Sequence, residues 1–430
     1  MSEAFLHYIW LHQYFDKKAL QTQAGEDILV HKPGLLNTHA GPDFSGAQIT
    51  IGSLRWAGHV EIHIRSSDWI YHRHQHDQAY ENVILHVVWD DDRPVQRPDG
   101  TPIPTLALKG RVDDALLRGF RKLINSGQSI PCSSQLASVP SLIRHAMFDR
   151  ALAQRLEKKG AEVLHLLATN TGDWEETTYQ VLARNFGFKV NAEPFFQLAK
   201  SLPVRLLRKH QNSLLQIEAL LFGQAGFLTT RTKDEYVQAL HKEYFFLARK
   251  YQLEEKMISP AQWRFLRLRP ANFPTLRLAQ FAAVIQKIPS LFSSLLAVQD
   301  VRALRDVLLA APSPYWHTHY RFGVKASPTR TKAHPQMGDD SVANIVVNTL
   351  APVWAAYRQH QDDQTHLDRA VDALQQLKPE SNRITRLWAQ AGVSAQHAFD
   401  SQAQIELYNH FCLPRHCLNC TIGGHLLKPR

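Results

Sequence analysis

Residues 42–63 read PDFSGAQITIGSLRWAGHVEIH, a stretch that alternates apolar and polar side chains on both sides of Gly52. This pattern predicts a β-hairpin in which Asp43 begins the first strand and Glu61 lies on the second. Because strand side chains alternate between faces, Glu61 and His63 point the same way. Two carboxylates that meet from neighbouring strands form a site for a hard cation, with room for a phosphate and an activated water. The hairpin therefore predicts a metal-dependent hydrolase.

The composition indicates a globular protein. The chain has 430 residues, of which 44% are hydrophobic and 10% aromatic, so two or three domains are expected. No apolar run approaches the roughly 18 residues that a membrane span requires, and the first residues lack the positive charge and apolar block of a signal peptide. Four cysteines are too few for a disulfide scaffold, which favours a reducing compartment. The sequence predicts a soluble cytoplasmic protein with no membrane partner.

The charge is unevenly distributed along the chain. Residues 1–130 contain 13 Lys and Arg against 15 Asp and Glu, whereas the remainder contains 36 against 24. An acidic excess suits a metal site, and a basic excess suits a polyanion such as nucleic acid. The stretch 263–277 interleaves arginines with aromatic residues, so Arg264, Arg267 and Arg269 are candidate substrate-binding residues for phosphate contacts. The alternative is an amphipathic helix whose arginines extend from an apolar face.

Periodicity predicts an α/β domain over residues 1–135, followed by a mostly α-helical domain over 136–405 and a cysteine-containing tail over 406–430 that packs back near Cys132. Within the first domain we expect a helix over 3–20, the hairpin, a loop with a short helix over 66–80, and strands over 28–30, 83–89 and 106–108. The run over 83–89 is almost wholly apolar, as expected of a strand covered on both faces. The expected fold is a mixed sheet with flanking helices joined to a large helical region.

Pro42 and Asp43, followed by Glu61-Ile62-His63, resemble the signature of the PD-(D/E)XK nucleases. The resemblance implies that Asp43 and Glu61 bind Mg²⁺ or Mn²⁺ and that an acid on the first helix, Glu3 with Glu26 as a substitute, completes the site. In that family a lysine follows the Glu and helps to activate water, whereas His63 occupies this position here. An imidazole can still hydrogen-bond a water or a phosphate oxygen, but it is a weaker fixed charge. The catalytic set implied by the resemblance is Asp43, Glu61, His63 and Glu3, and the departure at His63 leaves catalysis uncertain.

A histidine cluster follows the hairpin. His72, His74 and His76 would share one face of a strand and form a transition-metal site, as in a zinc hydrolase. Alternatively, the segment is a hydrated loop, or Asp68, His72 and His76 line the rim of the hairpin site and touch substrate. His86 lies among apolar residues and is expected to be a core histidine.

The chain contains Cys412, Cys417 and Cys420 in a C-x4-C-x2-C spacing, and Cys132 is its only other cysteine. Four thiolates satisfy one zinc ion or one [4Fe–4S] cluster, and His410 or His416 could replace a thiolate at zinc. The arrangement resembles the iron–sulfur staple of certain PD-(D/E)XK nucleases in helicase–nuclease complexes and in CRISPR adaptation. Its expected role is structural.

Over most of its length the sequence also resembles a family of uncharacterised bacterial proteins, the domain of unknown function DUF2851. The matching segments are 41–47, 58–63, 67–69, 84–88, 269–274 and the cysteine tail. This resemblance implies no activity. The favoured function is metal-dependent hydrolysis of DNA phosphodiester bonds; the alternative is a non-catalytic nucleic-acid-binding or assembly protein with a degenerate nuclease fold.

Overall fold

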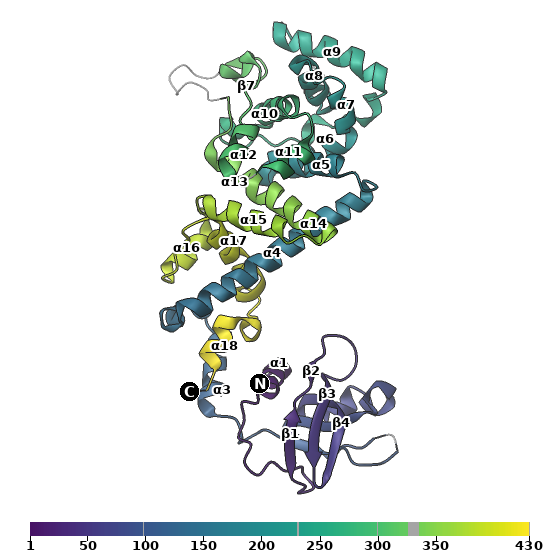
Figure 1. Ribbon diagram of the computed structural model, residues 1–430, viewed down its shortest axis with the longest axis vertical. Coiled ribbons are helices and arrows are strands. Elements are labelled where there is room, and N and C mark those ends of the chain that lie inside the picture. Colours follow the sequence, from purple (N-terminus) through teal and green to yellow (C-terminus); the bar gives the residue numbers. More distant parts are fainter. Residues whose placement is uncertain (98, 230–231, 299, 326–334, 430) are drawn as a thin grey trace. The chain divides into compact units, whose positions relative to one another are not determined.

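A computed structural model describes residues 1–97, 99–229, 232–298, 300–325 and 335–429 (Figure 1). The chain divides into two compact units. Unit 1 contains Met1–Met147, Leu387–Val393 and Leu407–Arg430, and unit 2 contains Phe148–Arg386 and Ser394–Glu406. Unit 1 is therefore assembled from segments that are far apart in the sequence.

A mixed sheet forms the centre of unit 1. Among the described residues its strands are β1 (Ile28–Lys32), β2 (Leu35–Leu36), β3 (Phe44–Ile51), β4 (Leu54–Arg65), β5 (Val83–Asp90) and β6 (Thr105–Ala107). They lie in the order β1-β3-β4-β5-β6, and β2 pairs with β3. The β1, β3 and β4 pairings are antiparallel, whereas β4, β5 and β6 run parallel to one another. This confirms the expected mixed sheet at the N-terminal side of the chain.

Strands β3 and β4 form the hairpin that the sequence pattern predicts. Gly52 forms its turn with a positive φ of 59°, a conformation that favours glycine. Phe44 pairs with Val60, and a bulge interrupts the pairing between Phe44 and Ala47. This register places the start of β3 beside the middle of β4, where Glu61 lies.

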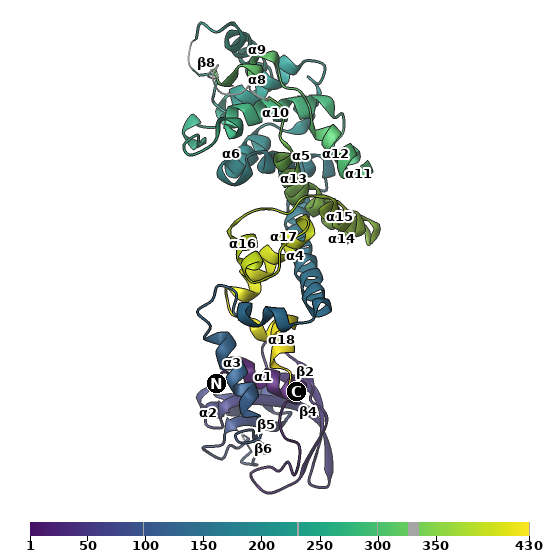
Figure 2. The same ribbon diagram turned by 90° about the vertical axis from the view of Figure 1, so that its left-hand side faces the viewer.

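Helices and short 3₁₀ turns surround the sheet. In unit 1 they are α1 (Glu3–His12), α2 (Asp68–Tyr71), η1 (His74–His76), η2 (Gln78–Tyr80), α3 (Asp114–Ile124), η3 (Ser133–Ser138), η9 (Tyr408–Cys412), η10 (Cys417–Asn419) and α18 (Thr421–Leu427). Phe5 of α1 stacks on Phe120 of α3 with ring centroids 3.9 Å apart, and α1, α3 and α18 lie near one another in both views (Figures 1 and 2). The expected helix over 3–20 ends at His12, because Gln13 adopts a left-handed conformation with φ 55°.

Unit 2 is mostly helical, which confirms the expected large helical region. Its described helices are α4 (Ser141–Thr169), α5 (Trp174–Phe186), α6 (Phe188–Ser201), α7 (Val204–Arg208), α8 (Leu214–Gln224), α9 (Glu235–Tyr251), α10 (Pro274–Lys287), α11 (Leu291–Ala297), α12 (Val301–Leu308), α13 (Asp339–Ile345), α14 (Ala351–Gln361), α15 (Thr365–Gln376), α16 (Arg383–Gln390) and α17 (Ala398–Leu407). The first residues of α4 and the last ones of α16 belong to unit 1. In α10 the residues Pro274 to Ile285 are all buried, so this helix forms the centre of the unit.

None of the described helices combines the length and the apolar character needed to cross a bilayer.

Candidate metal centre

Two carboxylates meet at the base of the hairpin through reciprocal contacts. The backbone N–H of Asp43 donates to Glu61 Oε2 at 3.0 Å, and the backbone N–H of Ile62 donates to Asp43 Oδ2 at 2.9 Å. Glu61 is only 4% exposed, whereas the Asp43 side chain is 23% exposed. The pair therefore presents one buried and one partly accessible carboxylate from neighbouring strands.

The carboxylate of Glu61 lies in an environment that disfavours its charge. Burial raises the pKa of Glu61, and repulsion from Asp43 raises it further, although a hydrogen bond with His74 acts in the opposite direction. Two carboxylates whose charges oppose each other are stabilised by a cation between them. The electrostatics of the pair therefore favour a bound metal ion.

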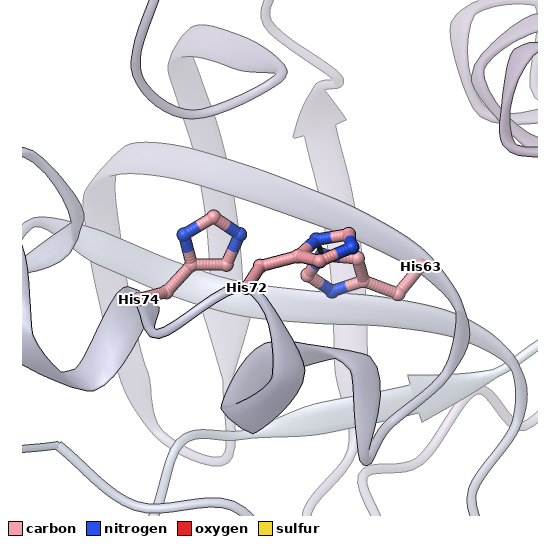
Figure 3. Close-up of side chains that lie close together, drawn as sticks. All are labelled: His63, His72 and His74. Atoms are coloured by element: carbon pink, nitrogen blue, oxygen red, sulfur yellow. Dashed lines mark hydrogen bonds between the residues drawn. The ribbon is translucent and has the colours of Figure 1, made fainter.

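Histidines line the same face of β4 as Glu61. His63 Nδ1 lies 2.8 Å from His86 Nε2, and His63 Nε2 lies 3.1 Å from His72 Nδ1. His63, His72 and His74 each offer a ligand atom, and these atoms all lie within 4.8 Å of one another (Figure 3). Among His, Cys, Asp and Glu of the described residues, this is the one group of three or more that meets that limit.

The central imidazoles are neutral. Burial lowers the pKa of His63 to about 2, with added repulsion from His86, His74 and His72. Burial likewise lowers the pKa of His86 to about 3. A neutral imidazole nitrogen is the form that binds metals and accepts protons.

Two buried imidazole nitrogens lie against the carboxylates. His7 Nε2 lies 3.2 Å from Asp43 Oδ2, and His74 Nε2 lies 3.4 Å from Glu61 Oε1. Neither contact has the full geometry of a hydrogen bond, so the carboxylates are the neighbours of these nitrogens but hold them only loosely. An imidazole nitrogen that lies this close to a carboxylate without a full hydrogen bond is placed to share a cation with it. Carboxylate oxygens and imidazole nitrogens are also the donor set that Mn²⁺ and Zn²⁺ accept, so the residues fit a divalent cation.

The nuclease resemblance implies Glu3, or Glu26 as a substitute, as the third acid of the site, but the structure places His7 beside Asp43. Glu3 is the first residue of α1, one turn before His7, and the α1 contact that the structure records with Asp43 comes from His7. Glu26 lies beside Gly52, at the opposite end of the hairpin from Asp43. His7 thus occupies the position at which the sequence suggested an acid.

The histidine-rich segment is helical rather than extended. His72 follows α2, and His74 begins the turn η1 that His76 ends. This geometry sends His72 and His74 toward His63 and leaves His76 exposed. Asp68 begins α2, and its Oδ2 accepts a hydrogen bond from the backbone N–H of Arg65. The alternative of a strand with residues 72, 74 and 76 on one face is therefore not formed, and His63, His72 and His74 lie together instead.

The three candidate arginines lie in unit 2 on an irregular segment. Arg264, Arg267 and Arg269 are all exposed, and Asn191 exchanges two hydrogen bonds with the backbone of Arg264. Residues 260–262 and 270–272 form short 3₁₀ turns, and the α-helix that follows them, α10, begins only at Pro274. The alternative of a single amphipathic helix over this stretch is therefore wrong, because Pro270 and Pro274 restrict the backbone before them.

All four cysteines lie in unit 1. Cys132 precedes η3, Cys412 ends η9, Cys417 begins η10 and Cys420 precedes α18. Each is buried, and none is joined in a disulfide. Segments that are far apart in the sequence therefore contribute thiols to one unit.

His7 and His86 are members of the site that sequence reasoning did not assign. The signal for His7 was its position one turn after Glu3 on a predicted helix. The signal for His86 was its place on the strand after Glu61, and the parallel register pairs these two residues directly. Both signals required the relative placement of elements that are separate in the sequence.

Comparison with known proteins identifies a family but no activity. A family model described as "Protein of unknown function (DUF2851)" matches residues 3–383. Neither the curated proteins nor the solved structures contain a significant match to this chain. The matched region covers most of the sequence, including Asp43, Glu61 and the histidine cluster. The chain therefore belongs to the DUF2851 family.

Proposed function

We propose that this protein is a metal-dependent phosphodiesterase acting on nucleic acid, with DNA as the favoured substrate. The observation that carries the proposal is the meeting of Asp43 and Glu61 from neighbouring strands, with a buried imidazole nitrogen of His7 or His74 against each carboxylate. The mixed sheet, the helix α1 before it and the two acidic residues on the hairpin also support the proposal.

Asp43 and Glu61 would hold Mn²⁺ or Mg²⁺, with His74 and His7 as neighbouring nitrogen donors. The metal, when bound, would polarise a phosphate oxygen and lower the pKa of a bound water. His63 occupies the position of the nuclease lysine, and its Nδ1 is oriented by His86. Its Nε2 faces Glu61 Oε1 at 3.5 Å and, as a neutral imidazole, can orient a water by a hydrogen bond.

The basic excess downstream of residue 130 suits a polyanionic substrate. Arg264, Arg267 and Arg269 are exposed on one short segment and are proposed to contact phosphates. Exposed cations of this kind would strengthen binding without selecting a base sequence. Substrate binding should therefore weaken as the salt concentration rises.

The proposal is tested by a nuclease assay with Mn²⁺ and with Mg²⁺ on single-stranded and duplex DNA, comparing wild type with Glu61→Ala. We expect cleavage by the wild type and a loss of at least about 100-fold in the variant, because metal and its bound water are then no longer held. Metal content is measured on the same sample. A folded, metal-loaded wild type that cleaves neither substrate would contradict a nuclease and favour the degenerate binding module.

The imidazole donors predict a preference for Mn²⁺ over Mg²⁺, since imidazole binds Mg²⁺ poorly. Replacing His74 by glutamine should lower Mn²⁺-dependent kcat/KM by about 10-fold or more while changing Mg²⁺-dependent activity less. His76→Gln is the matched control, because His76 lies two residues away on the same turn and is exposed. Equal losses in the two variants would favour the trio of 72, 74 and 76 instead.

The second candidate is a non-catalytic nucleic-acid-binding or assembly protein. It is favoured by His63 itself, because burial keeps the pKa of this side chain near 2 and so denies the site the positive charge of the nuclease lysine. A zinc hydrolase built on the histidines remains a third arrangement, and it predicts stoichiometric zinc that survives mutation of all four cysteines.

A further inference from the structure

Four buried thiols lie close enough to influence one another in unit 1. Each of the six pairs among Cys132, Cys412, Cys417 and Cys420 interacts electrostatically. Burial raises the pKa of Cys132 to about 12 and that of Cys417 to about 11, and repulsion between the thiols adds to both shifts. A single buried cysteine packs as a small apolar residue, but the gathering of all four cysteines of a chain at one place indicates a ligand set.

The thiols are brought together by specific contacts between distant segments. Arg415 donates to the backbone carbonyls of Gln128 at 3.0 Å and Ser126 at 2.8 Å. The hydroxyl of Thr421 lies 2.9 Å from the sulfur of Met147. These contacts join the segments before and after Cys132 to the segments before Cys417 and after Cys420. The packing of unit 1 therefore brings the four cysteines together.

The backbone around Cys417 is also closely packed. A Cβ on Gly423 would lie 2.0 Å from the carbonyl oxygen of Cys417, so only glycine fits where α18 begins. The same turn places Cys417 and Cys420 three residues apart, as in metal-binding C-x2-C motifs.

The spacing of the sulfur atoms distinguishes two metal groups. Tetrahedral zinc holds thiolates at about 2.3 Å, which places the sulfurs about 3.8 Å from one another. No three cysteine sulfurs of the described chain lie within 4.8 Å of one another, unlike the histidine ligand atoms above. A [4Fe–4S] cube separates its cysteine sulfurs further, because each binds a different iron and the inorganic core lies between them.

We propose that Cys132, Cys412, Cys417 and Cys420 hold a [4Fe–4S] cluster that fastens residues 407–430 to the segment around Cys132. Ligation converts four thiols to thiolates and releases four protons, while ferrous and ferric iron and sulfide come from cellular cluster assembly. Arg415 acts electrostatically on Cys412 and Cys417 and compensates part of the resulting negative charge. The inference does not depend on the proposed nuclease activity.

The test is chemical analysis of the full chain purified without oxygen, before and after reconstitution with iron and sulfide. We expect about four irons and four acid-labile sulfides per chain, with the broad visible absorption and Mössbauer spectrum of a cubane cluster. Cys132→Ser and Cys417→Ser should each lower the iron content several-fold, whereas Glu61→Ala should retain it. Oxidative loss of the cluster should also expose residues 407–430 to limited proteolysis.

Three outcomes would overturn the inference. One is stoichiometric zinc at the cysteines, another is a folded wild type that takes up no iron and sulfide, and the third is a full cluster in Cys132→Ser. The wild-type analysis stands even if a serine variant fails to fold. Because Glu61→Ala is included, loss of nuclease activity and loss of the cluster are measured separately.

Discussion

Replacement of Asp43 by asparagine is expected to weaken Mn²⁺ binding by at least about 100-fold and to abolish metal-dependent cleavage. Asparagine removes the negative charge but keeps an oxygen that can accept the hydrogen bond from the Ile62 backbone. The hairpin should therefore remain folded while the ion loses one of its two carboxylates. Isothermal titration with Mn²⁺ measures the effect directly, without requiring a substrate.

Two further variants give this experiment its controls. Asp27→Asn changes an exposed carboxylate at the start of β1 that accepts from Gln21, and it should leave Mn²⁺ affinity unchanged. Asp43→Ala removes the acceptor as well as the charge, so any additional loss of thermal stability measures the structural role of the Ile62 contact. If wild type and Asp43→Asn bind Mn²⁺ equally weakly, the hairpin is a degenerate module.

The stability of unit 2 is expected to fall as the pH rises from about 4.5 to about 7, through a single buried carboxyl group. Glu218 on α8 is fully buried, and burial raises its pKa to about 7 despite hydrogen bonds from Ser313 and Tyr236. Its Oε2 accepts from Tyr236 at 3.0 Å and from Ser313, while Oε1 has no partner among the described groups. An unfolded glutamate loses its proton near pH 4.5, so the folded state binds more protons between these two values.

The sign of the effect follows from this linkage. The contribution of Glu218 to stability is greatest below about pH 4.5, and about 3 kcal/mol of it is lost by the time the pH exceeds the folded pKa of this group. Glu218→Gln cannot ionise, so its stability should change less between about pH 5 and about pH 8. Glu235→Gln, on the exposed first turn of α9, is the control and should retain the wild-type pH profile.

Hydrogen exchange of α8 and α9, corrected for the intrinsic pH dependence of exchange, reports the opening of this region alone. The contribution of Glu218 is absent if wild type and Glu218→Gln show parallel profiles. The raised pKa of Glu218 could not be predicted from the sequence, because this residue is a single polar side chain within a stretch of apolar residues.

The part of the site that depends on local pattern could be predicted from the sequence. Strand alternation and the turn at Gly52 fix the register of the hairpin, and this register brings Asp43 to Glu61. The strand over 83–89 followed from its apolar run, which the structure buries on both faces. In each case neighbouring residues along the chain contain the necessary information.

Long-range placement accounts for what the sequence did not reveal. His7 reaches Asp43 because α1 packs on the sheet, and His86 reaches His63 because β5 pairs with β4 in parallel after a long connection. His74 joins the site and His76 does not because the segment forms a 3₁₀ turn, whose side chains do not alternate as in a strand. Packing between elements places His7 and His86 in the site, and a local turn places His74 there.

The segmented composition of unit 1 has a consequence for its synthesis on the ribosome. Residues 407–430 complete this unit, and Leu427 packs against Gly119 of α3. At typical translation rates, roughly tens of seconds separate the appearance of residue 147 from that of residue 407. During this interval the carboxylates and histidines have been made, but the segment that covers α3 has not. A nascent chain or a truncated product therefore carries the hairpin on an unfinished scaffold, and the proposed cluster cannot form until translation has passed Cys420.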